Sequence, residues 1–205
     1  KTTAGDAISL AEAKDIVILA SGTYTEDITI TQGVSVFGGY GEDGVRNVNG
    51  TQTIIDGTIF AENIDDHTEI NGLYIRDGIN VANSSENLIV RNNDISGGVV
   101  RAETLGLFAN EAAVYAYNSH AVIDGNNIHD SENGIWAQTN SSLTIVNNKI
   151  HDIQRGTSGY CYGIVDFSSS SSLIQNNIFW NNTETSNQII TPVGSSSTII
   201  GNTFY

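Results

Sequence analysis

Leu88-Ile89-Val90-Arg91-Asn92-Asn93-Asp94-Ile95 is the stretch of sequence that decides the fold, because its pattern recurs four more times in the chain. The later copies are 122–128, 143–150, 173–178 and 198–204. Each copy has a short apolar strand, a corner that contains asparagine, one polar position and one large apolar residue. Copies of this kind, about 20 to 33 residues apart and without helical periodicity, predict a β-solenoid.

An asparagine lies at the corner of every copy. Asparagine tolerates the left-handed backbone conformation that a sharp corner needs. Its side-chain amide can also bond the next asparagine, which satisfies polar groups beside the core. We therefore predict a stacked asparagine ladder along one edge of the solenoid, formed by Asn93, Asn126, Asn148, Asn176 and Asn202.

The whole chain, residues 1–205, is predicted to be a single all-β domain, a parallel β-helix of about nine coils. Coils would stack about 4.8 Å apart, with alternate apolar side chains pointing inward. The earlier coils have weaker strand candidates, at Ile16–Leu19, Val34–Phe37, Ile54-Ile55 and Ile70–Ile75. Two longer steps, 99–118 and 153–166, are predicted to be loop insertions.

Residues 1–15 are predicted to cap the first coil. Gly5–Lys14 is expected to be a short amphipathic helix with Ile8, Ala11 and Leu10 toward the core, because solenoid ends need a cover. The last coil, Gly201–Tyr205, has no such cap. An open coil presents unpaired strands, so we expect self-association through solenoid ends or edges.

Composition and charge restrict the partners of this protein. The chain of 205 residues has a formal net charge of −15, which excludes nucleic acid and anionic membranes as expected partners because both need a basic surface. The same charge disfavours uronate polymers unless bound calcium reverses the local field. No apolar run is long enough for membrane insertion. The chain opens with Lys1 and contains no Met, so we expect a processed chain or an excised piece.

Three segments near the start carry a resemblance: Gly22–Glu26, Val34–Tyr40 and Thr53–Gly57. They are similar to the opening coils of secreted bacterial β-helix surface proteins of the polymorphic outer-membrane protein type. With the asparagine repeats, the chain resembles the right-handed parallel β-helix superfamily, the pectate-lyase-like fold. The resemblance implies an extracellular or cell-surface location. It leaves function open, because this fold hosts lyases, epimerases, adhesins and structural proteins.

One outward column is the candidate binding site. The residue that follows the large apolar position of each coil should project outward and stack. In four coils this residue has an aromatic or imidazole ring. Sugar rings have apolar faces that pack on such side chains, so we predict a carbohydrate-binding track of His129, His151, Phe179 and Tyr205. A lyase needs a base that removes a proton and groups that neutralise the substrate carboxylate. The candidate catalytic residues near the column are His129, Asp130, His151, Asp152 and Arg155. No metal site is predicted; calcium is possible at the acidic loop 40–44.

Four Asn-x-Ser/Thr sequons predict glycosylation sites, at Asn49, Asn83, Asn140 and Asn181. Two functions follow from the sequence. The first is a non-enzymatic extracellular or cell-surface module, structural or adhesive, that assembles end to end into filaments. The alternative is a polysaccharide-binding protein, or a polysaccharide lyase or epimerase, of the pectate-lyase-like fold.

Overall fold

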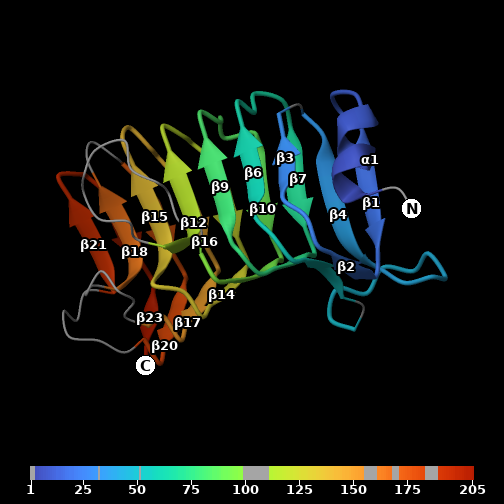
Figure 1. Cartoon of the computed structure of the whole chain (residues 1–205). Coiled ribbons are helices and arrows are strands. Elements are labelled where there is room, and N and C mark those ends of the chain that lie inside the picture. Colours follow the sequence, from blue (N-terminus) through green and yellow to red (C-terminus); the bar gives the residue numbers. More distant parts are fainter. Residues whose placement is uncertain are drawn as a thin grey trace.

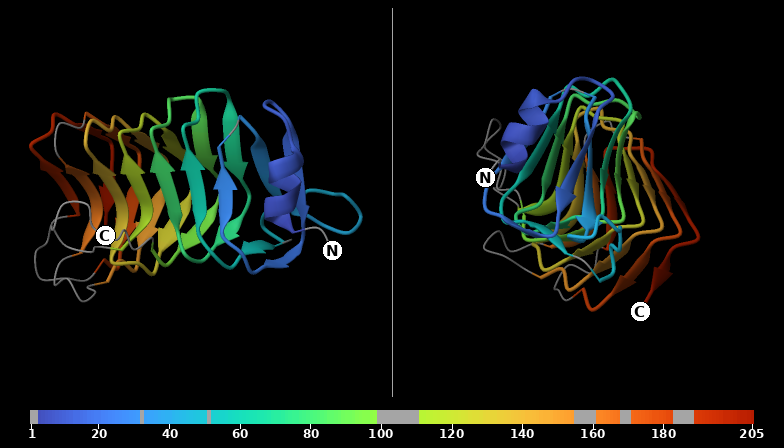
Figure 2. Two further views of the ribbon diagram at one scale, coloured as in Figure 1. Left: turned by 45° about the horizontal axis from the view of Figure 1, so that its top comes forward. Right: turned by 90° about the vertical axis from the view of Figure 1, so that its right-hand side faces the viewer.

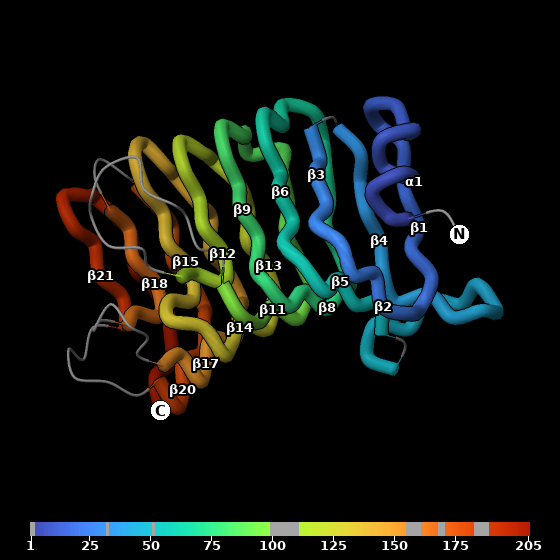
Figure 3. The backbone as a smooth tube through the Cα atoms, in the orientation of Figure 1, coloured from blue at the N-terminus to red at the C-terminus, as the bar shows by residue number. Residues whose placement is uncertain are grey.

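The chain is a rod of three parallel sheets, and each described coil except the last contributes one strand to each sheet (Figure 1). The computed structural model describes residues 3–31, 33–50, 52–98, 111–154, 161–167, 171–182 and 189–205. Successive coils climb along the rod axis in one direction, as the backbone trace shows (Figure 3). In the described part of the chain, no helix is long and apolar enough to cross a bilayer.

We name the sheets A, B and C in the order in which each coil visits them. Sheet A contains β1 (Ile16–Ala20), β4 (Ser35–Tyr40), β7 (Thr68–Asn71), β10 (Leu88–Arg91), β13 (Val122–Asp124), β16 (Thr144–Val146), β19 (Leu173–Gln175) and β22 (Thr198–Ile200). Sheet B contains β2 (Gly22–Tyr24), β5 (Thr53–Ile55), β8 (Tyr74–Ile75), β11 (Asp94–Ser96), β14 (Asn127–His129), β17 (Lys149–His151), β20 (Ile178–Trp180) and β23 (Thr203–Phe204). Sheet C contains β3 (Ile28–Ile30), β6 (Ile59–Glu62), β9 (Ile79–Ala82), β12 (Ala112–Tyr117), β15 (Asn133–Gln138), β18 (Tyr162–Phe167) and β21 (Ile190–Val193).

The core is a set of apolar columns inside the rod. Seen along its axis, the rod has three sides, and each side is one sheet (Figure 2). Alternate residues of each short strand point inward, and the parallel register keeps them in line: Val90 pairs with Ile70 on one side and Ile123 on the other. All three are fully buried. Each coil therefore depends on its neighbours to bury its apolar side chains.

The described residues form eight coils, whereas nine were predicted. Sheets A and B each have eight strands. The difference arises because Ile54-Ile55 was counted as a coil of its own. It lies in β5, on sheet B, in the same coil as β4. Two strand candidates separated by a long turn thus belong to one coil.

The asparagine ladder is present at the corner between sheets A and B. Asn126 is representative: its Nδ2 donates to the Val90 carbonyl at 2.9 Å and to Asn148 Oδ1 at 3.0 Å. Its Oδ1 accepts the backbone N–H of Asn93 at 3.0 Å. The ladder consists of Asn93, Asn126, Asn148, Asn177 and Asn202.

The prediction for one member of the ladder, Asn176, is wrong by one residue. Asn177 occupies the ladder, with Nδ2 3.0 Å from the Ile145 carbonyl and 3.0 Å from Asn202 Oδ1. Asn176 is the preceding corner residue, with φ +57°. Its equivalents in other coils include Asn92 and Gly125, which also have positive φ. Both asparagines of the pair are used, but only the second is buried beside the core.

The N-terminal helix α1 (Ala4–Leu10) covers the first coil, as predicted, but it ends earlier than Lys14. Thr3 and Asp6 form a capping box at its start. The Glu26 carboxylate accepts the N–H groups of Ala4 and Gly5 at 2.8 and 3.1 Å, which fixes the helix start to the rod. Ile8 is buried in the core, whereas Leu10 is 81% exposed, so the prediction that Leu10 faces the core is wrong.

The two predicted insertions, 99–118 and 153–166, contain strands of the rod. Residues 112–117 form β12, and residues 162–167 form β18, which includes the end of the second predicted insertion. Both strands pair on each side within sheet C. The rest of these segments, 99–110 and 155–160, lies outside the described residues. The sequence prediction overextended the insertions because sheet C strands follow no asparagine corner that marks them.

The ladder assignment predicts unequal effects for two adjacent residues. Asn177→Ala should lower the free energy of unfolding by about 2–4 kcal/mol, because it leaves the buried Ile145 carbonyl and Asn148 N–H without partners. Asn176→Gly is the matched control and should change stability by less than about 1 kcal/mol, because glycine keeps the left-handed corner. Urea unfolding followed by circular dichroism measures both. Equal losses in the two variants would contradict the assignment.

Candidate functional site

A column of aromatic rings lies on the outer face of sheet B. His129, His151 and Trp180 are consecutive register partners on β14, β17 and β20. The rings of His129 and His151 are 5.2 Å apart and those of His151 and Trp180 are 4.1 Å apart, each pair inclined by 12°. We call these three residues the ring column. They project outward because the preceding residue of each strand points into the core.

The backbone turns sharply directly after each ring of the column. Each ring is followed by a corner residue in the left-handed conformation: Asp130, Asp152 and Asn181 have φ of 51°, 52° and 50°. Each strand therefore ends just before this residue, and the side chains of these residues lie near the rings. Asn181 Nδ2 donates to Asp152 Oδ1, which links two neighbouring coils at this corner. Short polar residues are the side chains that favour this conformation.

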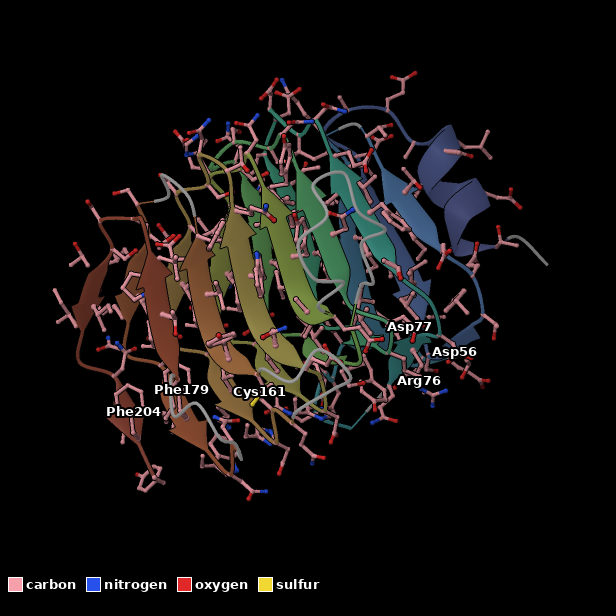
Figure 4. The ribbon with its side chains drawn as sticks, turned by 60° about the vertical axis from the view of Figure 1, so that its left-hand side comes forward. Asp56, Arg76, Asp77, Cys161, Phe179 and Phe204 are labelled. Atoms are coloured by element: carbon pink, nitrogen blue, oxygen red, sulfur yellow. The ribbon has the colours of Figure 1, made fainter. Side chains whose placement is uncertain are left out.

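One predicted member of the column, Phe179, lies elsewhere. Phe179 is fully buried inside the rod and stacks on Phe204, with ring centres 5.0 Å apart (Figure 4). Trp180 takes the outward place that was assigned to Phe179. The cause is the same one-residue error as at Asn176, because Ile178 occupies the polar position of its coil, paired with Lys149 and Thr203.

Tyr205 follows Phe204 as Trp180 follows Phe179. The pair Phe179 and Phe204 is in register, and the Tyr205 N–H donates to the Phe179 carbonyl at 2.9 Å. Tyr205 is 85% exposed.

Toward the N-terminal end of sheet B, Arg76 forms an ion pair with Asp56 at 3.0 Å, and its guanidinium lies 5.7 Å from the centre of the Tyr74 ring (Figure 4).

His129 is held between two carboxylates. Its Nε2 is 2.6 Å from Asp94 Oδ1, and its Nδ1 is 2.6 Å from Asp130 Oδ2. The hydrogen bond with Asp94, helped by that with Asp130 and opposed by partial burial, raises the pKa of His129 to about 9. The ring therefore carries a proton on both nitrogens at neutral pH and donates to both carboxylates. Its single positive charge lies between two carboxylates and offsets one of their two negative charges.

His151 has one carboxylate neighbour and one amide neighbour. Its Nδ1 is 2.6 Å from Asp152 Oδ2, and its Nε2 is 2.9 Å from Asn127 Oδ1. The hydrogen bond from His151, followed by that from Asn181, lowers the pKa of Asp152. Every polar atom of the two imidazoles is thus engaged, and the ring orientations are fixed.

Sequence reasoning missed Trp180 as a member of the column, and it missed Asp94 and Asn127, which bond the two imidazoles, and Asn181, which bonds Asp152. The signal for Asp94 and Asn127 was available, because each stands two residues before a column position and so points to the same face. Asn127 Nδ2 also lies 3.4 Å from Asp94 Oδ1. Of the candidate catalytic residues, Arg155 lies outside the described residues.

This geometry is better suited to binding than to proton abstraction. A general base must accept a proton near neutral pH, whereas His129 already holds its proton between two carboxylates. Within the described segments, no three His, Cys, Asp or Glu side chains come together in a way that could hold a metal ion. At the acidic loop, Asp43 Oδ1 accepts the Val45 N–H at 3.0 Å, which closes a turn. Calcium binding there stays a prediction.

The four sequon asparagines, Asn49, Asn83, Asn140 and Asn181, are exposed. Asn83 Oδ1 accepts the amide of Asn118 at 3.0 Å, and Asn181 donates to Asp152. Glycosylation at these positions stays a prediction.

Comparison with protein-family models gives one match over more than half of the chain. Residues 77–205 match the family described as "Right handed beta helix region". No curated protein matches the chain. No solved structure matches it either.

The environment of His129 predicts a pH-dependent stability. Its folded pKa of about 9 exceeds the unfolded value of about 6.5. The stabilisation is therefore complete below about pH 6.5 and lost as the pH rises through about 9, with a size on the order of 2–3 kcal/mol. Urea unfolding between pH 6 and 10 should show this loss in the unaltered chain and not in His129→Gln.

His120→Gln is the control, because His120 is exposed and lies outside the column; its pH profile should match the unaltered chain. NMR titration of the His129 ring gives the pKa directly. A titration midpoint near 6.5 would contradict the double carboxylate contact.

Proposed function

The chain belongs to the right-handed β-helix family, and from that premise we propose that it is an extracellular, non-enzymatic module that adheres to a neutral polysaccharide. The observation that carries this proposal is the ring column, three nearly parallel rings in consecutive coils. The faces of these rings pack on one another, so the column offers a ligand its outward ring edges and the face of Trp180 that does not pack on His151. Fixed carboxylate and amide groups beside them provide partners for hydroxyl groups.

The spacing of the column supports a chain-like ligand. Neighbouring strands of a sheet lie about 4.8 Å apart, which is close to the length of one pyranose unit. A polysaccharide that runs along the rod would therefore meet the edge of one ring, and the polar groups beside it, about once per sugar unit. Trp180 offers the largest apolar surface, and Tyr205 extends the line by one coil.

Charge restricts the polysaccharide to a neutral one. The chain has a net charge of −15, and Asp94, Asp130 and Asp152 border the rings. A polyuronate would be repelled by this surface. The same carboxylates argue against lyase or epimerase chemistry, because that chemistry needs cationic groups or metal ions to neutralise the substrate carboxylate.

Substitution of the Trp180 indole tests this function. Trp180→Ala should weaken binding of a soluble neutral glucan or xylan about tenfold, because an aromatic contact contributes on the order of 1 kcal/mol. Affinity electrophoresis in native gels measures the change. Tyr74→Ala is the matched control, since Tyr74 lies on the outer face of the same sheet but outside the column. Retention by polygalacturonate and not by neutral glycans would overturn the proposal.

Self-association is a second candidate function, and a specific observation favours it. Among the described residues, the exposed large apolar side chains belong to the first coils, with their helix and loop, and to the last coils. One group contains Leu10, Ile16, Ile18, Val45 and Val48, and the other contains Val193, Ile199, Ile200, Phe204 and Tyr205. Such residues are covered when another coil packs on them. We propose that a second copy of the chain supplies this coil.

Light scattering after size exclusion tests the association. The apparent mass should rise with protein concentration, and Ile200→Lys should abolish the rise, because a charge at the outermost strand of sheet A blocks stacking. Glu86→Lys is the control, since Glu86 is exposed in a turn of a middle coil. A constant monomer mass up to millimolar concentration would exclude this candidate.

A further inference from the structure

The outer face of sheet C carries a second row of side chains that the proposed function does not use. Phe60, Asn80, Tyr115, Trp136 and Val165 are consecutive register partners from β6 to β18. They alternate with inward residues such as Ile79, Val114 and Ile135, which are fully buried. We call Asn80, Tyr115 and Trp136 the sheet C row. It lies on a different side of the rod from the ring column (Figure 2).

Two polar atoms of this row are buried without a hydrogen-bond partner in the described structure. They are Asn80 Oδ1, an acceptor, and Trp136 Nε1, a donor. Asn80 is only 5% exposed. Between them, the Tyr115 hydroxyl donates to Gln138 Oε1 at 2.8 Å. An unpaired buried polar group costs about 1–3 kcal/mol, and such groups in folded proteins need an explanation.

Trp136 lies among other aromatic rings. The Tyr162 ring meets it nearly edge-on, with centres 6.5 Å apart and planes at 76°, and the Phe167 ring is 6.4 Å away at 37°. The indole as a whole is only partly buried. It thus combines a ring surface that is partly accessible with a buried N–H group that has no hydrogen-bond partner among the described residues. Stacking surface and a directed donor are the two features by which indoles bind sugars.

The electrostatic surroundings again favour a neutral ligand. Glu111 and Glu132 directly precede β12 and β15, the strands that carry Tyr115 and Trp136. Burial, followed by repulsion from Glu132, raises the pKa of Glu111. A further negative charge would be unfavourable here.

We propose that the outer face of sheet C is a second saccharide-binding surface, in which Trp136 stacks on one sugar unit and Asn80 bonds another. Trp136 Nε1 donates to a ligand oxygen, and Asn80 Oδ1 accepts a ligand hydroxyl. Two strand spacings, about 9–10 Å, separate these residues, which fits a neutral glycan that runs along the rod. The inference rests on the proposed function for its ligand class, but its residues are independent of the ring column.

The chain contains two Trp residues, one on each candidate surface, so tryptophan fluorescence can report them separately. Trp180→Phe leaves the Trp136 signal, and Trp136→Phe leaves the Trp180 signal. Each variant is titrated with cellohexaose, xylohexaose, maltohexaose and chitohexaose. We expect a saturable change of Trp136 emission with at least one hexasaccharide. Far-UV circular dichroism checks that both variants fold.

Asn80→Ala, added to the Trp180→Phe background, is the decisive variant. It should weaken the Trp136 response at least fivefold, and added to Trp136→Phe it should leave the Trp180 response unchanged. Because Asn80 Oδ1 has no hydrogen-bond partner among the described residues, this substitution should not lower the urea midpoint. A loss of binding in this variant is therefore not a loss of folding.

The outcomes separate this inference from the proposed function. If Trp180 responds and Trp136 does not, the inference is wrong and the ring column remains the binding site. If Trp136 alone responds and depends on Asn80, the inference holds and the ring column is not the site. If neither responds to any of the four sugars, both are wrong. A Trp136 response that Asn80→Ala leaves unchanged also overturns the inference.

Discussion

The structure depends on one constraint, the satisfaction of backbone groups at the corner between sheets A and B. Each coil must turn sharply beside the core, where water cannot bond the freed N–H and carbonyl groups. The ladder asparagines solve this problem, because each amide bonds one coil before it and one coil after it, as Asn126 does with Val90 and Asn148. The ladder thereby fixes the register between coils. Without that register, the inward apolar columns and the outward rings would not be in line.

Because neighbouring coils are in register, a repeat in the sequence becomes a column of chemically similar side chains in the structure. In this rod, the ladder is a column of amides, and most inward columns are aliphatic. Phe179 and Phe204 form an aromatic pair in an inward column, whereas the ring column is an aromatic column on the outside. The same register reduces repulsion between acidic groups, because it places a cationic side chain next to carboxylates of its own and the neighbouring coil. His129 is placed one coil away from Asp94 and beside Asp130, so its charge is shared between coils. A histidine elsewhere on the surface would hold no such pair of carboxylates.

The sequence was sufficient for the fold and for most of the ladder, because the corner asparagines recur with a nearly constant neighbourhood. It failed by one residue at Asn176, where two asparagines are followed directly by Ile178 and no charged residue marks the polar position. In a strand, a shift by one residue exchanges inside and outside, so the same error placed Phe179 on the surface and hid Trp180. Of the two carboxylate partners of His129, Asp130 is its neighbour in the sequence and was a candidate, whereas Asp94, 35 residues away in the chain, was not predicted. The sheet C row has no repeated signature at all, and Asn80 differs from Tyr115 and Trp136 in chemistry.

These failures have a common cause that also bears on function. Positions facing the core or the corner repeat because every coil has the same physical problem there. Positions facing outward are free to differ from coil to coil, since stacking alone is satisfied by many side chains. An outward column that is nevertheless aromatic, or an outward asparagine that is buried with an unpaired oxygen, is therefore not required by the fold. The ring column and the sheet C row are such departures, and both run along the rod axis, the one direction in which a β-helix offers a regular series of sites.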